Sequence, residues 1–168
     1  MFLNDRDFAT VVRSTPLVSI DFIVENQDGK YLVGYRTNCP AKGFWFVPGG
    51  RIRKDETFDE AFIRLTKLEL GKEISLDDGL FNGVWQHFYD DNFDGQPYTT
   101  HYIVLSFQLQ VDSSALQLSK EQHSDYLWLT SDELLHREDV HSYTRAYFTS
   151  SRQTACLSGQ KLNGQDHE

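Results

Sequence analysis

Residues 48–71 constrain the fold more than any other part of the chain. A Pro-Gly-Gly corner breaks the strand-like run 44–47, and a basic loop then leads into an apolar pattern of helical period. Thr57 begins a capping box of the Thr-x-x-Glu form, and Gly71 occupies the left-handed position that commonly ends a helix. This stretch therefore predicts a strand, a loop and a helix over residues 58–70.

The predicted helix carries an acidic residue on its apolar side. At about 100° per residue, the apolar side chains form one stripe, which contains Phe58, Ala61, Phe62 and Leu65. Glu69 lies about 20° from Phe58 on the helical wheel, so it is in line with this stripe. A carboxylate buried there needs compensation by a cation or by hydrogen-bond donors, and a divalent metal ion bound through oxygen atoms is one such cation. The alternative is a Glu69 side chain that turns outward to solvent at the helix end.

This stretch resembles the signature of the Nudix hydrolase family, G-x5-E-x7-R-E-U-x-E-E-x-G-U, in which U is a bulky apolar residue. Five positions match it at the correct spacing: Gly50, Glu56, Arg64, Glu69 and Gly71. Leu65 and Leu68 stand in place of two of the family's glutamates, and Thr66 and Lys72 replace apolar residues. In the family, those glutamates usually hold metal and help water attack phosphorus. Without them, the chain lacks the extra carboxylates of a usual pyrophosphohydrolase site.

The reduced signature is similar to that of one subfamily, GDP-mannose mannosyl hydrolase, also called GDP-mannose glycosyl hydrolase. The similarity covers roughly residues 1–150 and includes Asp21, Arg36, the stretch 85–93 and the segment Glu121-Gln122-His123. It implies an α/β (α+β) Nudix fold, in which a mixed sheet lies between helices and a loop–helix–loop forms the catalytic edge. We expect one domain over residues 1–152 and a mobile tail over residues 153–168.

The resemblance also implies roles for individual residues. Mg²⁺, with Mn²⁺ as a substitute, is expected to bind Glu69, the carbonyl oxygen of Gly49 and the side chain of Gln122. His123 is expected to be the general base, because an imidazole of ordinary pKa accepts a proton near neutral pH. The side chains expected to stabilise charge on the departing diphosphate are Arg51, Arg64 and Tyr102. Those expected to bind the sugar and the phosphates are Asp21, Arg36, His87, Arg51 and Tyr102.

Several of these roles have a plainer alternative. Arg64 has the right spacing for an ion pair with Glu60 on the same helix. His101 and Tyr102 are neighbours on one strand, so only one of them faces the site, and the resemblance selects Tyr102. The remaining alternatives are a solvent-facing Asp21, a surface charge at Arg36, a half-buried strand histidine at His87 and an exposed loop histidine at His123.

The rest of the chain is predicted to alternate between short helices and strands. The expected helices are residues 4–13, 131–136 and 141–152, and the expected strands are 17–24, 30–36, 80–89, 98–111 and 126–129. The acidic segment 90–97 lacks the spacing of a calcium loop and is predicted to connect a hairpin. The segments 113–119 and 120–125 are predicted to be a linker and a polar loop.

The resemblance to GDP-mannose mannosyl hydrolases implies Mg²⁺-dependent hydrolysis of GDP-mannose, and of GDP-glucose, to GDP and free sugar. Water is expected to attack the anomeric carbon with inversion, as in inverting glycosidases. One alternative is a Nudix pyrophosphohydrolase that cuts at phosphorus and releases GMP and a sugar phosphate. The other is a non-catalytic Nudix module that binds nucleotide.

Composition narrows the setting in which the protein works. A net charge of −9 on 168 residues disfavours a nucleic-acid partner. No apolar run approaches the roughly 18 residues of a membrane span, and no secretory signal opens the chain. Cys39 and Cys156 are expected to be unpaired thiols of a cytoplasmic protein. The resemblance adds a homodimer and a role in GDP-sugar metabolism.

Overall fold

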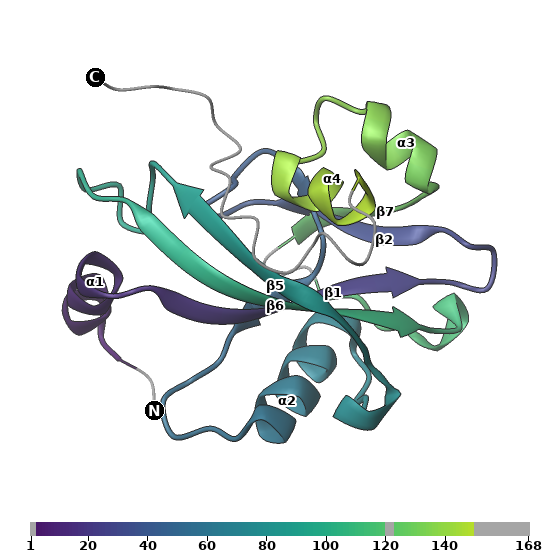
Figure 1. Cartoon of the computed structure of the whole chain (residues 1–168), viewed down its shortest axis with the longest axis horizontal. Coiled ribbons are helices and arrows are strands. Elements are labelled where there is room, and N and C mark those ends of the chain that lie inside the picture. Colours follow the sequence, from purple (N-terminus) through teal and green to yellow (C-terminus); the bar gives the residue numbers. More distant parts are fainter. Residues whose placement is uncertain (1–2, 120–122, 150–168) are drawn as a thin grey trace.

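A computed structural model describes residues 3–119 and 123–149 (Figure 1). One β-sheet lies between helices: α2 (Phe58–Leu70) covers one face, and α3 (Ser131–His136) and α4 (Ser142–Thr149) cover the other. Helix α1 (Asp5–Ser14) lies beside one end of the sheet (Figure 1). The predicted α/β architecture, a mixed sheet sandwiched between helices, is confirmed.

The sheet is built from strands far apart in sequence. Within the described residues the strands are β1 (Leu17–Glu25), β2 (Tyr31–Arg36), β3 (Trp45–Phe46), β4 (Gly49–Arg51), β5 (Leu80–Tyr89), β6 (Thr100–Gln110) and β7 (His123–Leu129). The main order is β3-β2-β1-β6-β5, while β4 also pairs with β1 and β7 with β2. The pair β1–β6 is parallel and the other pairs are antiparallel, so the sheet is mixed. Two short 3₁₀ turns are η1 (Leu76–Asp78) and η2 (Ser113–Ala115).

Alternating side chains of β1 divide the core between the two faces of the sheet. Ile20 and Phe22 pack toward α2, where the rings of Phe22 and Phe62 meet edge to face at 5.1 Å. Ile23 packs on the opposite face, in a cluster that includes Leu134 of α3. Asp21 lies on this second face of the strand, and only 7% of its surface is exposed. The solvent-facing alternative for Asp21 is therefore wrong.

Helix α2 begins and ends where local chemistry predicts. Thr57 accepts a hydrogen bond from the Glu60 amide, and the Glu60 side chain accepts one from the Thr57 amide, which completes the capping box. Gly71 has φ of 70°, a left-handed conformation that favours glycine, and its amide donates to the carbonyl of Lys67. The predicted bounds, 58–70, are confirmed.

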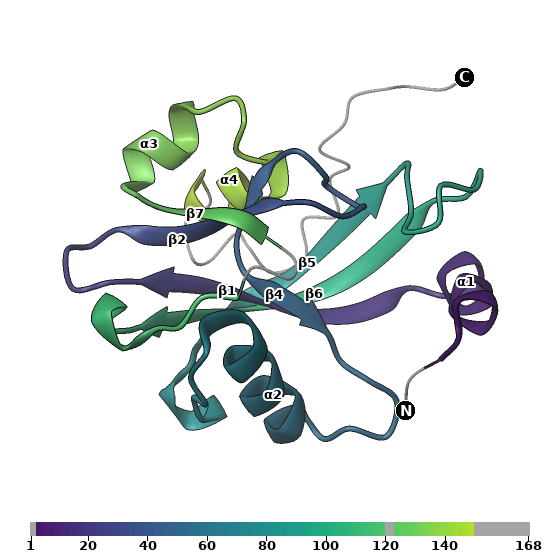
Figure 2. The same cartoon turned by 180° about the vertical axis from the view of Figure 1, so that it is seen from behind.

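Strands β1 and β2 separate soon after their hairpin. Their register pair is Glu25↔Tyr31, and β2 then turns toward β7 and β3 (Figure 2). The first half of β1 consequently pairs with β4 instead of with β2. Its backbone groups need such a partner because unpaired buried amides and carbonyls are costly. Two predicted site residues lie on these strands, Asp21 on β1 and Arg36 on β2.

Tertiary pairing changes several predicted boundaries. The run 44–47 contributes only β3, and part of the predicted corner forms β4. The segment 120–125 is not all loop, because β7 begins at His123, and residues 120–122 lie outside the described part of the chain. The linker 113–119 contains η2. The last described helix ends at Thr149, so the predicted continuation to 152 and the tail 153–168 also lie outside the described residues.

Candidate functional site

Predicted site residues reach one region from seven elements of the fold. They are Asp21 on β1, Arg36 on β2, Gly49 and Arg51 on β4, Glu69 on α2, His87 on β5, Tyr102 on β6 and His123 on β7. Gln122, the third predicted metal ligand, lies outside the described residues. The charges of Asp21 and Arg36 act on Tyr102, and that of Arg36 also acts on His123, so these groups share one electrostatic environment.

Glu69 faces the interior of the protein. Its exposed surface is 2%, and its Oε2 lies 3.7 Å from Nδ1 of His123, which is itself 1% exposed. The alternative in which Glu69 turns outward to solvent is therefore wrong. A carboxylate and an imidazole, 54 residues apart in sequence, meet at the end of α2 because β7 pairs with β2 beside it.

His123 is a buried strand residue, and both the loop position and the ordinary pKa predicted for it are wrong. Its ring rests on Gly34 of β2, where an added Cβ would lie 2.5 Å from Cγ of the histidine. Burial, reinforced by the charge of Arg36, lowers the pKa of His123 to about 4. The imidazole is therefore neutral at pH 7 and able to accept a proton. Among the described residues, its Nε2 has no hydrogen-bond partner.

Gly49 offers a backbone oxygen close to this site. It pairs with Asp21 in the β1–β4 ladder, while the hydrogen-bonded neighbours on either side are Gly50 with Ile20 and Pro48 with Phe22. Alternation in an antiparallel pair directs the Gly49 carbonyl away from β1. A side chain at this position is excluded, since a Cβ would lie 2.7 Å from Oδ1 of Asp21.

The oxygen donors present fit a hard divalent ion. Mg²⁺ binds carboxylate and carbonyl oxygens and retains several waters, so a site with one carboxylate and one carbonyl from the protein is compatible with it. Over the described ranges, no group of three or more His, Cys, Asp or Glu side chains is placed to hold a metal ion. The protein contribution is thus poor in charge, and the remaining positions would have to come from substrate and water.

Asp21 and His87 belong to a buried hydrogen-bond network. The hydroxyl of Tyr147 donates to Oδ2 of Asp21 at 2.7 Å and lies 3.4 Å from Nε2 of His87. On the other side of the ring, the hydroxyl of Tyr89 lies 3.5 Å from Nδ1. Burial raises the pKa of Asp21 to about 7, against the opposing effects of the Tyr147 hydrogen bond and Arg36. Burial, and then the charge of His141, lowers the pKa of His87 to about 3, so His87 is neutral.

Tyr102 faces this network and its neighbour does not. The ring of Tyr102 lies 6.2 Å from that of Tyr89, whereas His101 stacks on Phe88 at 4.3 Å. This arrangement agrees with the expected alternation along β6. Burial raises the pKa of Tyr102, so its hydroxyl keeps its proton at neutral pH. The guanidinium of Arg51 lies 3.9 Å over the ring of Phe8 of α1, which holds it beside the site.

Comparison with known proteins defines the family. The model of the NUDIX domain matches residues 15–149. The chain is a Nudix protein. The low-salt glycan biosynthesis protein Agl8 of Haloferax volcanii is 36% identical over 122 residues, which cover 73% of this chain and 76% of that protein. An ADP-ribose pyrophosphatase of Methanocaldococcus jannaschii is 43% identical over 56 residues, which cover 33% of this chain and 32% of that protein.

Solved structures share the Nudix fold. The MutT protein of Methanosarcina mazei superimposes with a TM-score of 0.63 at 24% identity, over 80% of this chain and 92% of that chain. The MutT Nudix hydrolase of Burkholderia pseudomallei gives 0.64 at 22% identity, over 80% and 97%. At such identities these likenesses establish the fold alone. No described helix of this chain has the length and apolarity needed to span a membrane.

The retained Nudix residues Glu56 and Arg64 form a structural clamp. Two hydrogen bonds join them, from Nε of Arg64 to Oε1 at 2.5 Å and from Nη2 to Oε2 at 2.7 Å. Nη2 also donates to the carbonyl of Arg51 at 2.9 Å. The Glu60 carboxylate instead accepts from Thr57, so the predicted alternative of an Arg64–Glu60 pair is wrong. Arg64 therefore positions the backbone of Arg51 at the end of β4.

The two Nudix positions that have lost glutamate occupy different environments. Leu65 is 2% exposed and lies directly beneath Gly50, where an added Cβ would come within 2.6 Å of its Cδ2. Leu68 is 37% exposed. Leu65 thus fills with apolar packing the position at which other Nudix signatures carry a glutamate. Glu69 is left as the single carboxylate among these three signature positions.

Sequence reasoning missed the tyrosines of the last helix. Tyr143 and Tyr147 are buried on one side of α4, and the ring of Tyr143 stacks on His87 at 4.0 Å, nearly parallel at 8°. Their spacing of four residues places them on the same helical face, which is the one signal the sequence offered. His141, just before α4, contributes a further ring beside Phe46 at 5.2 Å.

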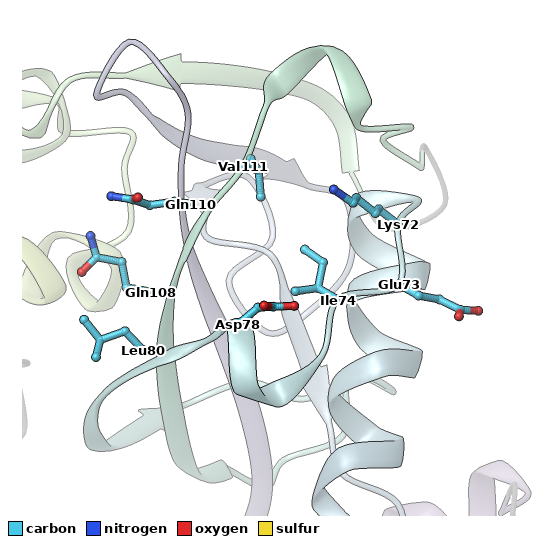
Figure 3. A pocket seen from close by; sticks show the side chains of 8 residues that line it. All are labelled: Lys72, Glu73, Ile74, Asp78, Leu80, Gln108, Gln110 and Val111. Atoms are coloured by element: carbon cyan, nitrogen blue, oxygen red, sulfur yellow. The ribbon is translucent and has the colours of Figure 1, made fainter.

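A separate groove contains none of the predicted site residues. Its volume is about 610 Å³, and it lies between the end of α2, η1 and the strands β5 and β6 (Figure 3). Its lining residues are Lys72, Glu73, Ile74, Asp78, Leu80, Gln108, Gln110 and Val111. Charges of both signs border it, which gives no preference for an anionic or a cationic ligand.

Proposed function

We propose that this Nudix hydrolase converts GDP-mannose, and GDP-glucose, to GDP and free sugar in a Mg²⁺-dependent reaction, as GDP-mannose mannosyl hydrolases do. The observation that carries the proposal is the pairing of Glu69, on the signature helix α2, with His123 of β7, while Leu65 of the same helix packs against Gly50. A site so poor in carboxylates is suited to assisting departure of a nucleotide from carbon. The Haloferax relative is named for glycan biosynthesis, a process that consumes activated sugars, which supports a nucleotide-sugar substrate.

Glu69, the Gly49 carbonyl and Gln122 are the proposed ligands of the metal. When bound, Mg²⁺ neutralises charge on the diphosphate and so makes GDP a better leaving group. Arg51 and Tyr102 donate toward the same phosphates, and Arg64 holds the backbone of Arg51 in place. Arg36 adds positive charge at the end of β2.

Asp21 and His87 bind the sugar hydroxyls in this proposal. Both are buried next to aromatic rings, so hydrogen bonds to them form in a region of low dielectric. His123, neutral at pH 7, takes a proton from water as the water oxygen attacks the anomeric carbon. The bond between that carbon and the β-phosphate oxygen breaks, and its electron pair leaves with GDP. Attack opposite the leaving group inverts the anomeric centre.

Hydrolysis in ¹⁸O-labelled water tests the proposal. We expect ¹⁸O in the released sugar and none in GDP. Label in the nucleotide, with GMP as product, would instead establish cleavage at phosphorus, the reaction class in the name of the Methanocaldococcus relative. Binding of GDP-mannose without turnover in the presence of Mg²⁺ would establish a non-catalytic module.

The expected setting of the protein is part of the proposal. We predict that the protein is a cytoplasmic homodimer and that it has no nucleic-acid or membrane partner. Sedimentation of the purified chain tests the dimeric state, and a monomer at micromolar concentration contradicts it.

A further inference from the structure

Helix α4 connects three parts of the site. The hydroxyl of Tyr143 accepts a hydrogen bond from the amide of Phe88 and donates one to its carbonyl, each at 2.8 Å. These bonds anchor β5 at the residue that follows His87. Thr144, fully buried, accepts from the amide of Val47, two residues before Gly49. The hydroxyl of Tyr147 reaches Asp21 on β1. One helical face thus contacts strand β5, the segment that leads into β4, and strand β1.

Tyr147 differs from Tyr143 in what its hydroxyl contacts. Tyr143 bonds to backbone, whereas Tyr147 bonds to two side chains proposed to hold the sugar. Its one hydroxyl proton is donated to Oδ2 of Asp21 at 2.7 Å, so toward His87 its oxygen acts as an acceptor. While Asp21 is ionised, above its pKa of about 7, this arrangement assigns the ring proton to Nε2 of His87 and leaves Nδ1 to accept from Tyr89.

The same hydrogen bond orients the carboxylate of Asp21. Tyr147 occupies Oδ2, and Oδ1 lies on the side of Gly49, where an added Cβ would come within 2.7 Å of it. Rotation of the carboxylate would break the bond to Tyr147. Tyr147 therefore fixes which oxygen of Asp21 faces β4 and which nitrogen of His87 is protonated.

We infer that Tyr147 is a positioning residue for sugar recognition, acting through Asp21 and His87, and that helix α4 is consequently part of the substrate site. This inference rests on the proposed function for the identity of the substrate. The hydrogen-bond arrangement of Tyr147, Asp21 and His87 is independent of the proposed function, because it can be measured in the protein without substrate.

The kinetic test compares Tyr147→Phe with Tyr143→Phe. Both substitutions remove one hydroxyl from a tyrosine of α4, and the two side chains are similarly buried, at 7% and 4% exposure. We expect Tyr147→Phe to lower kcat/KM for GDP-mannose roughly 10- to 100-fold, the range for loss of a hydrogen bond to a charged group. The dissociation constant for GDP should change less than about twofold. GDP lacks the mannose, so it makes none of the hydrogen bonds that Asp21 and His87 are proposed to form with the sugar. Tyr143→Phe should lower thermal stability without a comparable loss of kcat/KM.

A double-mutant cycle with Asp21→Asn tests whether Tyr147 acts through Asp21. Tyr147→Phe should have little further effect in the Asp21→Asn background, because the carboxylate that it orients is then absent. Independent, multiplicative losses would overturn the inference. So would equal losses of GDP and GDP-mannose affinity, which would indicate a structural role only.

A spectroscopic measurement separates failure of this inference from failure of the proposed function. Long-range ¹H–¹⁵N correlation spectra of the full chain distinguish the two neutral tautomers of His87. At about pH 8.5, where Asp21 is ionised, we expect the Nε2–H form in the wild type and in Tyr143→Phe, and a population of the Nδ1–H form in Tyr147→Phe. A wild-type ring protonated on Nδ1 would overturn the inference whatever substrate is hydrolysed. If GDP-mannose is not hydrolysed but the tautomer changes as expected, the proposed substrate is wrong and the arrangement stands.

Discussion

Substitution of Gly34 by alanine tests how His123 is held. Gly34 lies within β2 in a backbone conformation that any residue can adopt, and the three atoms nearest to an added methyl group all belong to His123. An ideal Cβ would lie 2.5 Å from Cγ and 3.0 Å from Cβ of His123, well inside ordinary contact. The histidine must therefore move by about 1 Å, away from its present distances of 3.7 Å to Glu69 and 3.3 Å to the hydroxyl of Tyr126.

The expected cost follows from overpacking. Forcing an extra methyl group into a packed interior costs about 1–3 kcal/mol, which corresponds to a fall in Tm of roughly 2–12 °C for a chain of this size. Displacing a catalytic group by about 1 Å is expected to lower turnover by roughly 100-fold. Thermal unfolding and initial rates of GDP release measure the two effects.

A second substitution identifies the cause of the loss. His123→Ala removes the ring and leaves only the 3.0 Å contact with the Cβ of residue 123, so adding Gly34→Ala to that variant should cost much less in stability, and the two changes should show a coupling of about 1–3 kcal/mol. Full stability and turnover in the Gly34→Ala single variant would refute the placement of His123 on this glycine. An undiminished stability cost in the double variant would assign the strain to another neighbour.

Three further predictions address the metal site, the signature helix and the response to pH. At about 100 times its dissociation constant, Mg²⁺ should stabilise the wild type by about 2.7 kcal/mol, a rise in Tm of roughly 5–10 °C, and Glu69→Gln should lose most of this rise in a thermal scan. Leu65→Glu, which buries a carboxylate beneath Gly50, should destabilise the protein by roughly 3–5 kcal/mol in denaturant titrations, while Leu68→Glu at its exposed position should stay within about 0.5 kcal/mol. In metal-free protein, burial lowers the pKa of His101 below the ordinary 6.5, and it lowers the pKa values of three further histidines to about 3 or 4; these are His87, His123 and His141. The unfolded chain then binds more protons between about pH 4 and 6.5, so the free energy of unfolding should fall by roughly 1–3 kcal/mol per pH unit on acidification. Asp21, with its pKa raised to about 7, partly opposes this fall, because the folded protein holds its proton.

Each of these predictions has a clear contrary result. An equal Mg²⁺-dependent rise in Tm for wild type and Glu69→Gln would remove Glu69 from the metal site. Equal stability of the two leucine variants would contradict the packing of Leu65. Flat stability between about pH 4 and 6.5 would mean that the histidines are not held neutral by burial, and Asp21→Asn should steepen the slope if its opposing effect is real.

Local chemistry made the signature helix predictable. The Thr57 capping box, the apolar stripe and the Gly71 terminus act within a few residues of one another, so their outcome does not depend on the rest of the fold. Alternation along β5 and β6 is equally local, and it correctly separated Tyr102 from His101. The periodicity of α2 also placed Glu69 in line with buried residues, although it left open whether the side chain turned outward.

Contacts between distant segments decided the rest. Arg64 pairs with Glu56 across a loop in preference to Glu60 on its own helix, because Glu60 is already engaged by the helix cap. His123 is buried because β7 adds to β2 above a glycine, a pairing that no periodicity within residues 120–129 encodes.

The sequence by itself determined the strand–loop–helix unit, the family signature and the residue types proposed to bind Mg²⁺ and a nucleotide sugar. Only the tertiary structure decided that Asp21 and His87 are joined by Tyr147, 126 residues from Asp21 along the chain. The physical reason is one of range. Helix caps and strand alternation arise from neighbours in sequence, whereas burial, and with it the pKa of each site residue, depends on which remote side chains close over it.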